Sequence, residues 1–266
     1  MLTYRRFTLL FFLVLAAINL LAWLPGLFLE KTGPGLVIVL NLFVILAWLS
    51  VSVAMSFLPC SGFYLPVICR GTAGAREVAV TFDDGPSAGF TPGVLEVLAR
   101  HGAKAAFFCT GQNLQKNRLL GERIAGEGHI IGNHSWSHSF RFDLFSFHRI
   151  QIELERTDEQ VMAITGKRPL LFRPPFGVIN PTLAKALSRD PRHTVCWNIR
   201  SFDTLRRDPG KVTGRILRKL KPGSVILLHD HTPYVQNHLD RLLDGIRDAG
   251  FAIVPLDKLI DVNAYA

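Results

Sequence analysis

The stretch EVAVTFDDGP at residues 77–86 predicts a short buried β-strand that ends in two carboxylates and a turn. Its first six residues are mostly apolar or β-branched, and Gly85-Pro86 favours a turn. Because successive side chains of a strand point to opposite faces, Asp83 and Asp84 point in different directions and can take different tasks. A surface turn explains this stretch equally well when it is taken alone, so the two carboxylates need support from the rest of the chain.

Further apolar runs follow and alternate with amphipathic segments, which is typical of βα units and a parallel sheet. Such units that close on themselves form a barrel, whose reactive groups sit at the carboxyl ends of the strands. An open doubly wound sheet is the alternative, but the G-x-G-x-x-G turn expected after its first strand is absent. We predict seven strands, at residues 77–82, 104–109, 129–132, 170–172, 193–198, 224–228 and 251–254.

Two histidines follow the third predicted strand, in the segment HSWSH at residues 134–138. Their spacing of four places His134 and His138 on one side of a helical turn, so that both imidazoles can reach one metal ion. With one carboxylate from another strand end, they form a ligand set that leaves positions open for water and substrate. Two unrelated surface histidines are the alternative for either residue alone.

Two more strand ends carry polar residues. In RPPFG at 173–177, the paired prolines fix the backbone and hold Arg173 in place to bind a carboxylate. In SVILLHD at 224–230, His229 stands at the end of an apolar strand, where a structural histidine is also common. Polar clusters at four different strand ends nevertheless indicate one shared site.

Together, TFDDGP at 81–86, HSWSH at 134–138, RPPFG at 173–177 and LLH at 227–229 resemble, in order, the motifs of the polysaccharide deacetylase family, also known as the NodB-homology domain or carbohydrate esterase family 4. The resemblance covers about residues 76–261. It implies an α/β fold, a distorted (β/α)7 barrel, that removes N-acetyl or related acyl groups from the amino sugars of a polysaccharide, peptidoglycan or lipid-linked glycan.

The resemblance also implies a role for each matching residue. The bound metal, usually Zn²⁺, would polarise the amide carbonyl and lower the pKa of water towards about 7, and a base and an acid would then move protons. The implied metal ligands are Asp84, His134 and His138. The implied base is Asp83 with Arg173 as its partner, the acid is His229, and the substrate contacts are Pro175, Leu227 and the backbone N–H of Phe176.

One motif departs from the family pattern. Family members commonly carry an Asp-Trp pair after the fifth strand, and this chain has Asp203-Thr204. The resemblance implies that Asp203 orients either the acid histidine or the arginine. Thr204 replaces the tryptophan that packs beside the acetyl methyl group, which leaves the acyl selectivity open, with Trp197 or Phe202 as possible substitutes.

The first 69 residues are of a different kind. No charged residue occurs at 7–29 or at 36–69, and each run exceeds the roughly 20 apolar residues that cross a bilayer. We predict membrane helices at 7–29 and 36–59 with a turn at 33–35, which makes 1–69 an anchor and 76–261 the catalytic domain. A signal peptide is the alternative for the first run, although no small-x-small cleavage site follows it.

Charge gives a prediction of sidedness. Arg5, Arg6, Arg70 and Arg76 flank the two predicted spans, and Lys31 is the basic residue between them. By the positive-inside rule, this favours a two-span cell-membrane protein with its catalytic domain on the cytoplasmic face, where a lipid-linked amino sugar could be the substrate.

Net charge and cysteines exclude other classes of protein. The chain carries a formal net charge of +9 without any nucleic-acid motif, so we expect a bilayer and not nucleic acid as its partner. Cys60, Cys69, Cys109 and Cys196 form no C-x-x-C pair, and we predict no disulfide framework. A non-catalytic carbohydrate-binding protein, and an amidohydrolase acting on a formyl group or a non-sugar amide, remain as alternatives.

Overall fold

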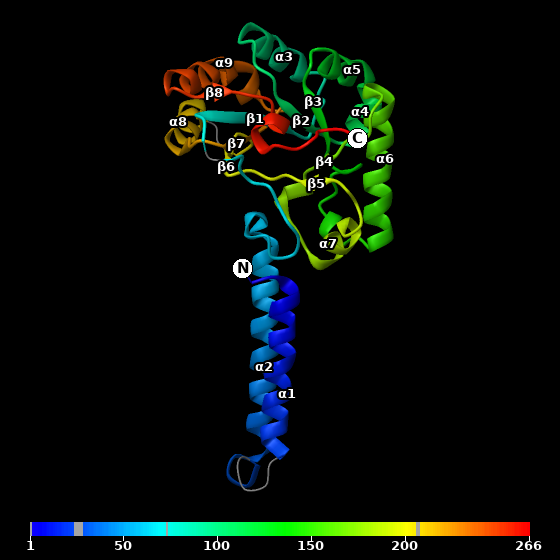
Figure 1. Cartoon of the computed structure of the whole chain (residues 1–266), viewed down its shortest axis with the longest axis vertical. Helices are drawn as coiled ribbons and strands as arrows, with labels where there is room; N and C mark the ends of the chain where they lie inside the picture. The colour runs from blue at the N-terminus through cyan, green and yellow to red at the C-terminus, as the bar shows by residue number, and fades with distance from the viewer. Residues whose placement is uncertain (1, 24–28, 73, 206–207) are drawn as a thin grey trace.

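The computed structural model describes residues 2–23, 29–72, 74–205 and 208–266, in which a two-helix hairpin projects from an α/β domain (Figure 1). Helices α1 (Tyr4–Trp23) and α2 (Leu29–Ser56) pack antiparallel, and the amide groups of Asn19 and Asn41 exchange hydrogen bonds between them. Both helices are long and apolar enough to cross a membrane, and only 6% of each span is buried. The predicted hairpin is therefore present.

The helix bounds differ from those predicted. The turn predicted at residues 33–35 is wrong, because these residues lie within α2 and Pro34 is inside the helix. Residues 24–28, which connect α1 to α2 in the sequence, lie outside the described part of the chain. A proline removes one backbone hydrogen bond from the helix around it, and α2 continues through Pro34 despite that loss.

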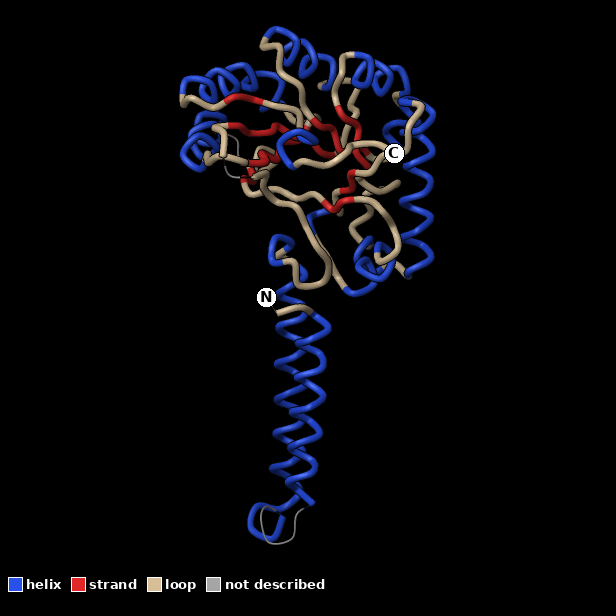
Figure 2. The backbone as a smooth tube through the Cα atoms, in the orientation of Figure 1, coloured by secondary structure: helices blue, strands red, loops and turns tan. Residues whose placement is uncertain are grey.

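The sheet of the α/β domain is parallel and curled, and helices cover it (Figure 2). Its strands follow the order β5-β4-β3-β2-β1-β7-β6, and β8 also pairs with β1. The central strands are buried on both faces, which explains why they read as continuous apolar runs. The strand bounds are β1 Glu77–Asp83, β2 Ala106–Cys109, β3 Ile130–Asn133, β4 Leu171–Phe172, β5 His193–Thr194, β6 Ile199–Arg200, β7 Ser224–His229 and β8 Ala252–Ile253.

The run predicted as one strand at 193–198 is two strands. Strand β5 pairs with β4, whereas β6 pairs with β7 at the other end of the sheet. Between them, the N–H of Val195 donates to the carbonyl of Phe172 and the N–H of Asn198 donates to that of Val225. Four residues thus pass from one edge of the sheet to the other, so the edges lie close together and the fold is a distorted barrel. An apolar run does not reveal such a change of partner.

Helices pack on the outer face of the sheet, and a short helix fills part of its inner face. Inside, Ala79, Phe108 and Val225 pack against Leu256 and Leu259 of the last helix. Side chains along a strand alternate between its two faces, so Asp83, four residues after Ala79 on β1, also points to the inner face. The helices of the domain are α3 Thr91–Arg100, α4 Gly111–Lys116, α5 Arg118–Gly126, α6 Phe147–Thr165, α7 Pro181–Leu187, α8 Pro209–Lys219, α9 Pro233–Asp248 and α10 Leu256–Ile260.

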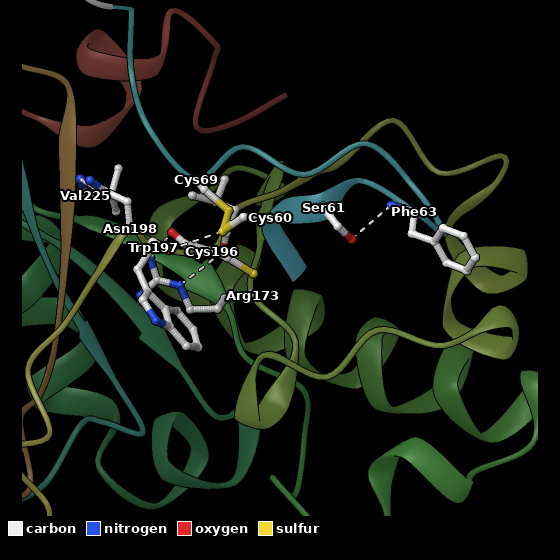
Figure 3. Close-up of a disulfide and its surroundings, with 10 residues drawn as sticks. Cys60, Ser61, Phe63, Cys69, Arg173, Cys196, Trp197, Asn198 and Val225 are labelled. Atoms are coloured by element: carbon white, nitrogen blue, oxygen red, sulfur yellow. Dashed lines mark hydrogen bonds between the residues drawn. A yellow bond between two sulfur atoms is a disulfide. The ribbon is translucent and has the colours of Figure 1, made fainter. Parts of the chain in front are cut away.

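The hairpin is fixed to the domain by the segment that follows α2. The carbonyl of Ser56, the last residue of α2, accepts a hydrogen bond from the N–H of Ile179, and Ile68 exchanges backbone hydrogen bonds with Thr194 and Cys196. A disulfide closes the same segment, which corrects the prediction from the cysteine pattern. Cys60 and Cys69 are bonded (Figure 3). Cys109 and Cys196 are buried and free.

Candidate active site

Three potential metal ligands meet at the carboxyl ends of β1 and β3. The Nε2 atoms of His134 and His138 lie 3.5 and 3.3 Å from Oδ1 of Asp84, and the three ligand atoms lie within 4.8 Å of one another. Oδ1 of Asp84 is buried and makes no hydrogen bond. Two imidazoles and a carboxylate are a common donor set for catalytic zinc, so the residues present fit a divalent cation.

The two histidines converge for a different reason from the one predicted. Residues 134–139 form a loop and not a helical turn, in which Ser135 and His138 have φ values of 62° and 45°. The N–H of Ser135 donates to the side chain of Asn133, and the N–H of His138 donates to the hydroxyl of Ser135. These bonds fold the loop back, so that the two imidazole rings lie 4.8 Å apart.

The protonation states of His138 and Asp84 suit a cation, whereas the carboxylates of Asp83 and Asp84 outweigh burial and raise the pKa of His134. Burial and the neighbouring His134 lower the pKa of His138 to about 4. Burial opposes the ionised form of Asp84, but the adjacent imidazoles of His134 and His138 outweigh this and lower the pKa. Nδ1 of His134 lies 2.7 Å from the carbonyl of Arg173, which turns Nε2 towards the site. A neutral imidazole and an ionised carboxylate are the forms that bind metals.

A buried ion pair lies beside these ligands. Nη1 of Arg173 donates to Oδ1 of Asp83 at 2.6 Å, and both side chains are almost fully buried. The guanidinium also donates to Thr81 and to the carbonyls of Val195 and Cys196. These bonds satisfy the buried charge, which is otherwise expensive. The other oxygen of Asp83, Oδ2, lies 3.8 Å from Nε2 of His134 and therefore faces the ligands. The predicted pairing is observed.

Strand β7, which pairs with β1, ends at His229, and this histidine forms a second charged pair. Nδ1 of His229 lies 2.8 Å from Oδ1 of Asp203, and the N–H of His229 donates to Oδ2 of the same carboxylate. Burial alone would lower the pKa of His229, but the hydrogen bond and charge of Asp203 outweigh it and raise the pKa. The predicted partners of Asp203 were His229 and Arg173, and the structure pairs Asp203 with His229.

The three predicted substrate contacts differ in solvent exposure. Pro175 and Leu227 are buried, whereas Phe176 is 48% exposed and its ring lies 4.6 Å from that of His138. Phe176 has a φ of 58° in a short helical turn at Pro175–Gly177. Non-glycine residues with positive φ are uncommon, and here they gather at the site, because Asp84 also has a φ of 74°.

Trp197 and Phe202 are the aromatic residues considered as substitutes for a tryptophan at position 204. Trp197 packs against Gly177, where an added Cβ would lie 2.7 Å from the indole ring. The guanidinium groups of Arg200 and Arg215 lie 5.1 and 4.6 Å from the centre of the Phe202 ring. Neither residue lines the cavity that contains Asp84 and His138.

That cavity has a volume of about 480 Å³ and is polar. Its walls include Asp84, His138, Gln112 and Lys116, together with a further histidine that the sequence motifs did not single out. This residue is His231, whose Nδ1 lies 3.7 Å from Oδ2 of Asp84. Its position two residues after His229, in the run LLHDH, was the available signal.

Comparisons with known proteins agree with this geometry. The family profile described as polysaccharide deacetylase matches residues 70–195. The peptidoglycan-N-acetylglucosamine deacetylase PgdA of Listeria monocytogenes is 33% identical over 80% of the chain, which spans 45% of the length of that relative. A peptidoglycan-N-acetylglucosamine deacetylase of Bacillus cereus is 32% identical over 73% of the chain and 71% of its own length.

Solved structures show the same fold. The Bc1960 peptidoglycan N-acetylglucosamine deacetylase, crystallised with 4-naphthalen-1-yl-N-oxidanyl-benzamide, is 30% identical with a TM-score of 0.72, and the match covers 75% of this chain and 95% of that one. BA3943 of Bacillus anthracis, a pseudoenzyme of carbohydrate esterase family 4, is 26% identical with a TM-score of 0.69 over 74% of this chain and 69% of that one. From the identity and coverage of these matches, the chain belongs to the polysaccharide deacetylase family.

Proposed function

We propose that the protein is a metal-dependent hydrolase that removes N-acetyl groups from the amino sugars of a glycan. One observation carries the proposal. Asp83 of β1 and His229 of β7 stand directly opposite each other in the register of the two strands, with Asp84, His134 and His138 beside them. A base and an acid thus flank a potential metal site, which is the arrangement that amide hydrolysis needs. The names of the bacterial relatives support the choice of substrate.

Asp84, His134 and His138 would hold the metal, for which zinc is the preferred candidate from the donor set. When bound, a zinc ion supplies Lewis acidity, which polarises the carbonyl and acidifies water. Asp83 would take the proton of the attacking water through Oδ2, the oxygen that faces the ligands. Arg173 binds the other oxygen and so fixes the direction of the carboxylate.

His229 would donate a proton to the departing amine. Without that proton, the tetrahedral intermediate would expel water instead of the amine. Asp203 holds the ring through Nδ1, which leaves Nε2 to face the substrate, and it raises the pKa so that the ring is protonated over a wider pH range. The backbone N–H of Phe176 is the candidate donor to the oxyanion. The products are acetate and a free amino sugar.

A product assay tests the proposal. We expect the full chain, loaded with zinc in detergent, to release acetate from an N-acetylglucosamine oligosaccharide or glycolipid and to leave one new amine for each acetate. Formamido sugars and N-acetylated non-sugar amides serve as the comparison, because Thr204 leaves the acyl group open. A chelator should stop the release, and added zinc should restore it. Release of acetate from none of these sugars would contradict the proposal, and a protein that binds glycans without cleaving them would then explain the fold.

We further propose that α1 and α2 anchor the protein in a cell membrane, with the catalytic domain on the oxidising side. The disulfide supports this orientation, because disulfides persist outside the cytoplasm, and Cys60 follows the end of α2 on the same side as the domain. The arrangement of arginines around the spans favours the opposite orientation. We give more weight to the disulfide, because it requires an oxidising compartment, whereas a few charges only bias insertion.

Reporter fusions decide the orientation. We expect a reporter that is active only outside the cytoplasm to be active when it is fused after Ala266. The same reporter fused after Glu30, which leaves only the first span, should be inactive because the loop between the spans lies on the other side. The reverse pattern would return the catalytic domain to the cytoplasmic face.

A further inference from the structure

A second cavity lies between the membrane anchor and the active site. It has a volume of about 510 Å³ and is lined by two groups of residues. One group is Phe57–Ser61, directly after α2, and the other consists of Phe176, Gly177, Trp197 and Arg200 of the domain. Because the ring of Phe176 also contacts that of His138, this groove, which we name the anchor groove, adjoins the metal ligands.

The anchor groove is built and held by specific contacts. Sγ of Cys60 lies 3.4 Å from the carbonyl of Trp197, so the disulfide packs against the segment that supplies the indole (Figure 3). The next carbonyl along the chain towards the N-terminus, that of Cys196, accepts from Arg173. On the opposite wall, the hydrogen bond from Ile179 to Ser56 holds the end of α2 beside the Phe176 turn. The anchor therefore forms one wall of the groove and is not merely a tether.

The chemistry of the walls points to an amphipathic, anionic ligand. Phe57 and Leu58 are 63% and 55% exposed at the end of a helix that is long and apolar enough to cross a membrane. Across from them, the guanidinium of Arg200 lies 5.9 Å from the centre of the Trp197 ring. Among the described residues that line the groove, none is acidic. An exposed arginine beside apolar side chains suits a phosphate that is joined to an alkyl chain.

We propose that the anchor groove binds the lipid phosphate of a lipid-linked glycan, and that this places the acylated amino sugar of the same molecule at the metal site. The inference deepens the proposed function and rests on it. Arg200 binds the phosphate, and Phe57 and Leu58 contact the first carbons of the lipid as it leaves the bilayer at the end of α2. The anchor thus selects substrates that are still attached to the membrane over soluble glycans.

The test compares two substrates that differ only in their lipid. One is an N-acetylglucosamine disaccharide joined through phosphate to a long isoprenoid chain, and the other is the same disaccharide phosphate on a short, water-soluble chain. We expect the full chain in nanodiscs to have a kcat/KM at least about tenfold higher for the long-chain substrate, mainly through KM. Arg200→Gln should raise KM for it about tenfold, which is the typical effect of losing a charge-assisted hydrogen bond.

Matched variants separate the groove from general surface effects. The double variant Phe57→Ser, Leu58→Ser should reduce the ratio of long-chain to short-chain kcat/KM towards one. Arg241→Gln on α9 and Leu119→Ser on α5, which replace exposed residues away from the groove, should leave that ratio unchanged. Unfolding temperatures of all variants should stay close to that of the wild type, because the substituted side chains are exposed.

The outcomes distinguish the two proposals. Equal kcat/KM for both substrates, or a preference for a soluble N-acetylglucosamine polymer, would overturn the anchor-groove proposal while leaving deacetylation intact. If no sugar is hydrolysed, equilibrium binding of the long-chain substrate decides. If the long-chain substrate binds and Arg200→Gln weakens this binding about tenfold, the anchor-groove proposal is supported, and the absence of hydrolysis counts only against the proposed reaction. Binding that Arg200→Gln does not weaken would overturn both.

Discussion

Replacement of Asp83 by asparagine should reduce kcat for acetate release by at least about a thousandfold, within the range that general-base catalysis contributes. The substitution keeps the shape of the side chain and removes its ability to accept a proton. KM should change little, because Asp83 is buried beside His134 and does not line the polar cavity. The measurement is steady-state acetate release by zinc-loaded protein, with zinc content determined on the same sample.

The zinc content and the fold provide the controls. Asp84, His134 and His138 are unchanged in this variant, so it should still bind one zinc ion per chain. Its stability should fall, since the removal of one partner of a buried ion pair commonly costs about 3–5 kcal/mol. Asp248→Asn, which changes an exposed aspartate at the end of α9, should match the wild type in both assays. A folded, zinc-loaded Asp83→Asn protein that retains a tenth of the wild-type kcat would rule out this base.

The location of the site was predictable from the sequence because its residues follow apolar strands. Asp83 and His229 end the two longest described strands, which are buried along almost their whole length. Burial on both faces gives such strands a continuous apolar sequence that can be recognised without a structure. Parallel strands bring their carboxyl ends to one edge, so residues far apart in the chain were expected to meet there. The meeting of Asp84, His134 and His138 with Asp83 and His229 followed from that rule and from the family motifs.

Local geometry was less predictable. The spacing of His134 and His138 indicated a helical turn, but side-chain bonds from Asn133 and Ser135 fold this segment as a loop. Such bonds compete with helical hydrogen bonds, and their outcome depends on neighbours that a single sequence does not place. The apolar run at 193–198 hid its change of strand partner for the same reason, because periodicity reports burial and not pairing.

The junction between anchor and domain was the least predictable part. Cys60 and Cys69 are only nine residues apart, and the four cysteines of the chain form no recognisable pattern of disulfide pairs. Their bond depends on the path of residues 57–71 across the domain, which is set by backbone hydrogen bonds to distant strands. Residues 57–61 of this path also line the anchor groove. The Cys60–Cys69 disulfide, which the cysteine count did not reveal, therefore bears both on the proposed orientation in the membrane and on the proposed substrate.

Replacement of Asp203 by asparagine should change the pH dependence of the reaction. The hydrogen bond and charge of Asp203 are the largest effects that raise the pKa of His229 against burial, so their loss lowers the pKa, while the charges of Asp83 and Asp84 still raise it. The acid must be protonated to act, and activity is lost as pH rises through its pKa. The alkaline limb of the kcat profile should therefore move to lower pH, and kcat at pH 8 should fall at least about tenfold.

Ser201→Ala is the matched control for this shift. The hydroxyl of Ser201 donates to Oδ1 of Asp203, so its removal takes one hydrogen bond from the carboxylate but leaves the negative charge beside His229. If charge sets the pKa of the acid, Ser201→Ala should keep the alkaline limb close to its wild-type position while Asp203→Asn moves it. Equal shifts in the two variants would mean that Asp203 acts by holding the ring in place. An unchanged limb in Asp203→Asn would show that a group other than His229 protonates the amine, and His231, which lies beside Asp84, would be the next residue to substitute.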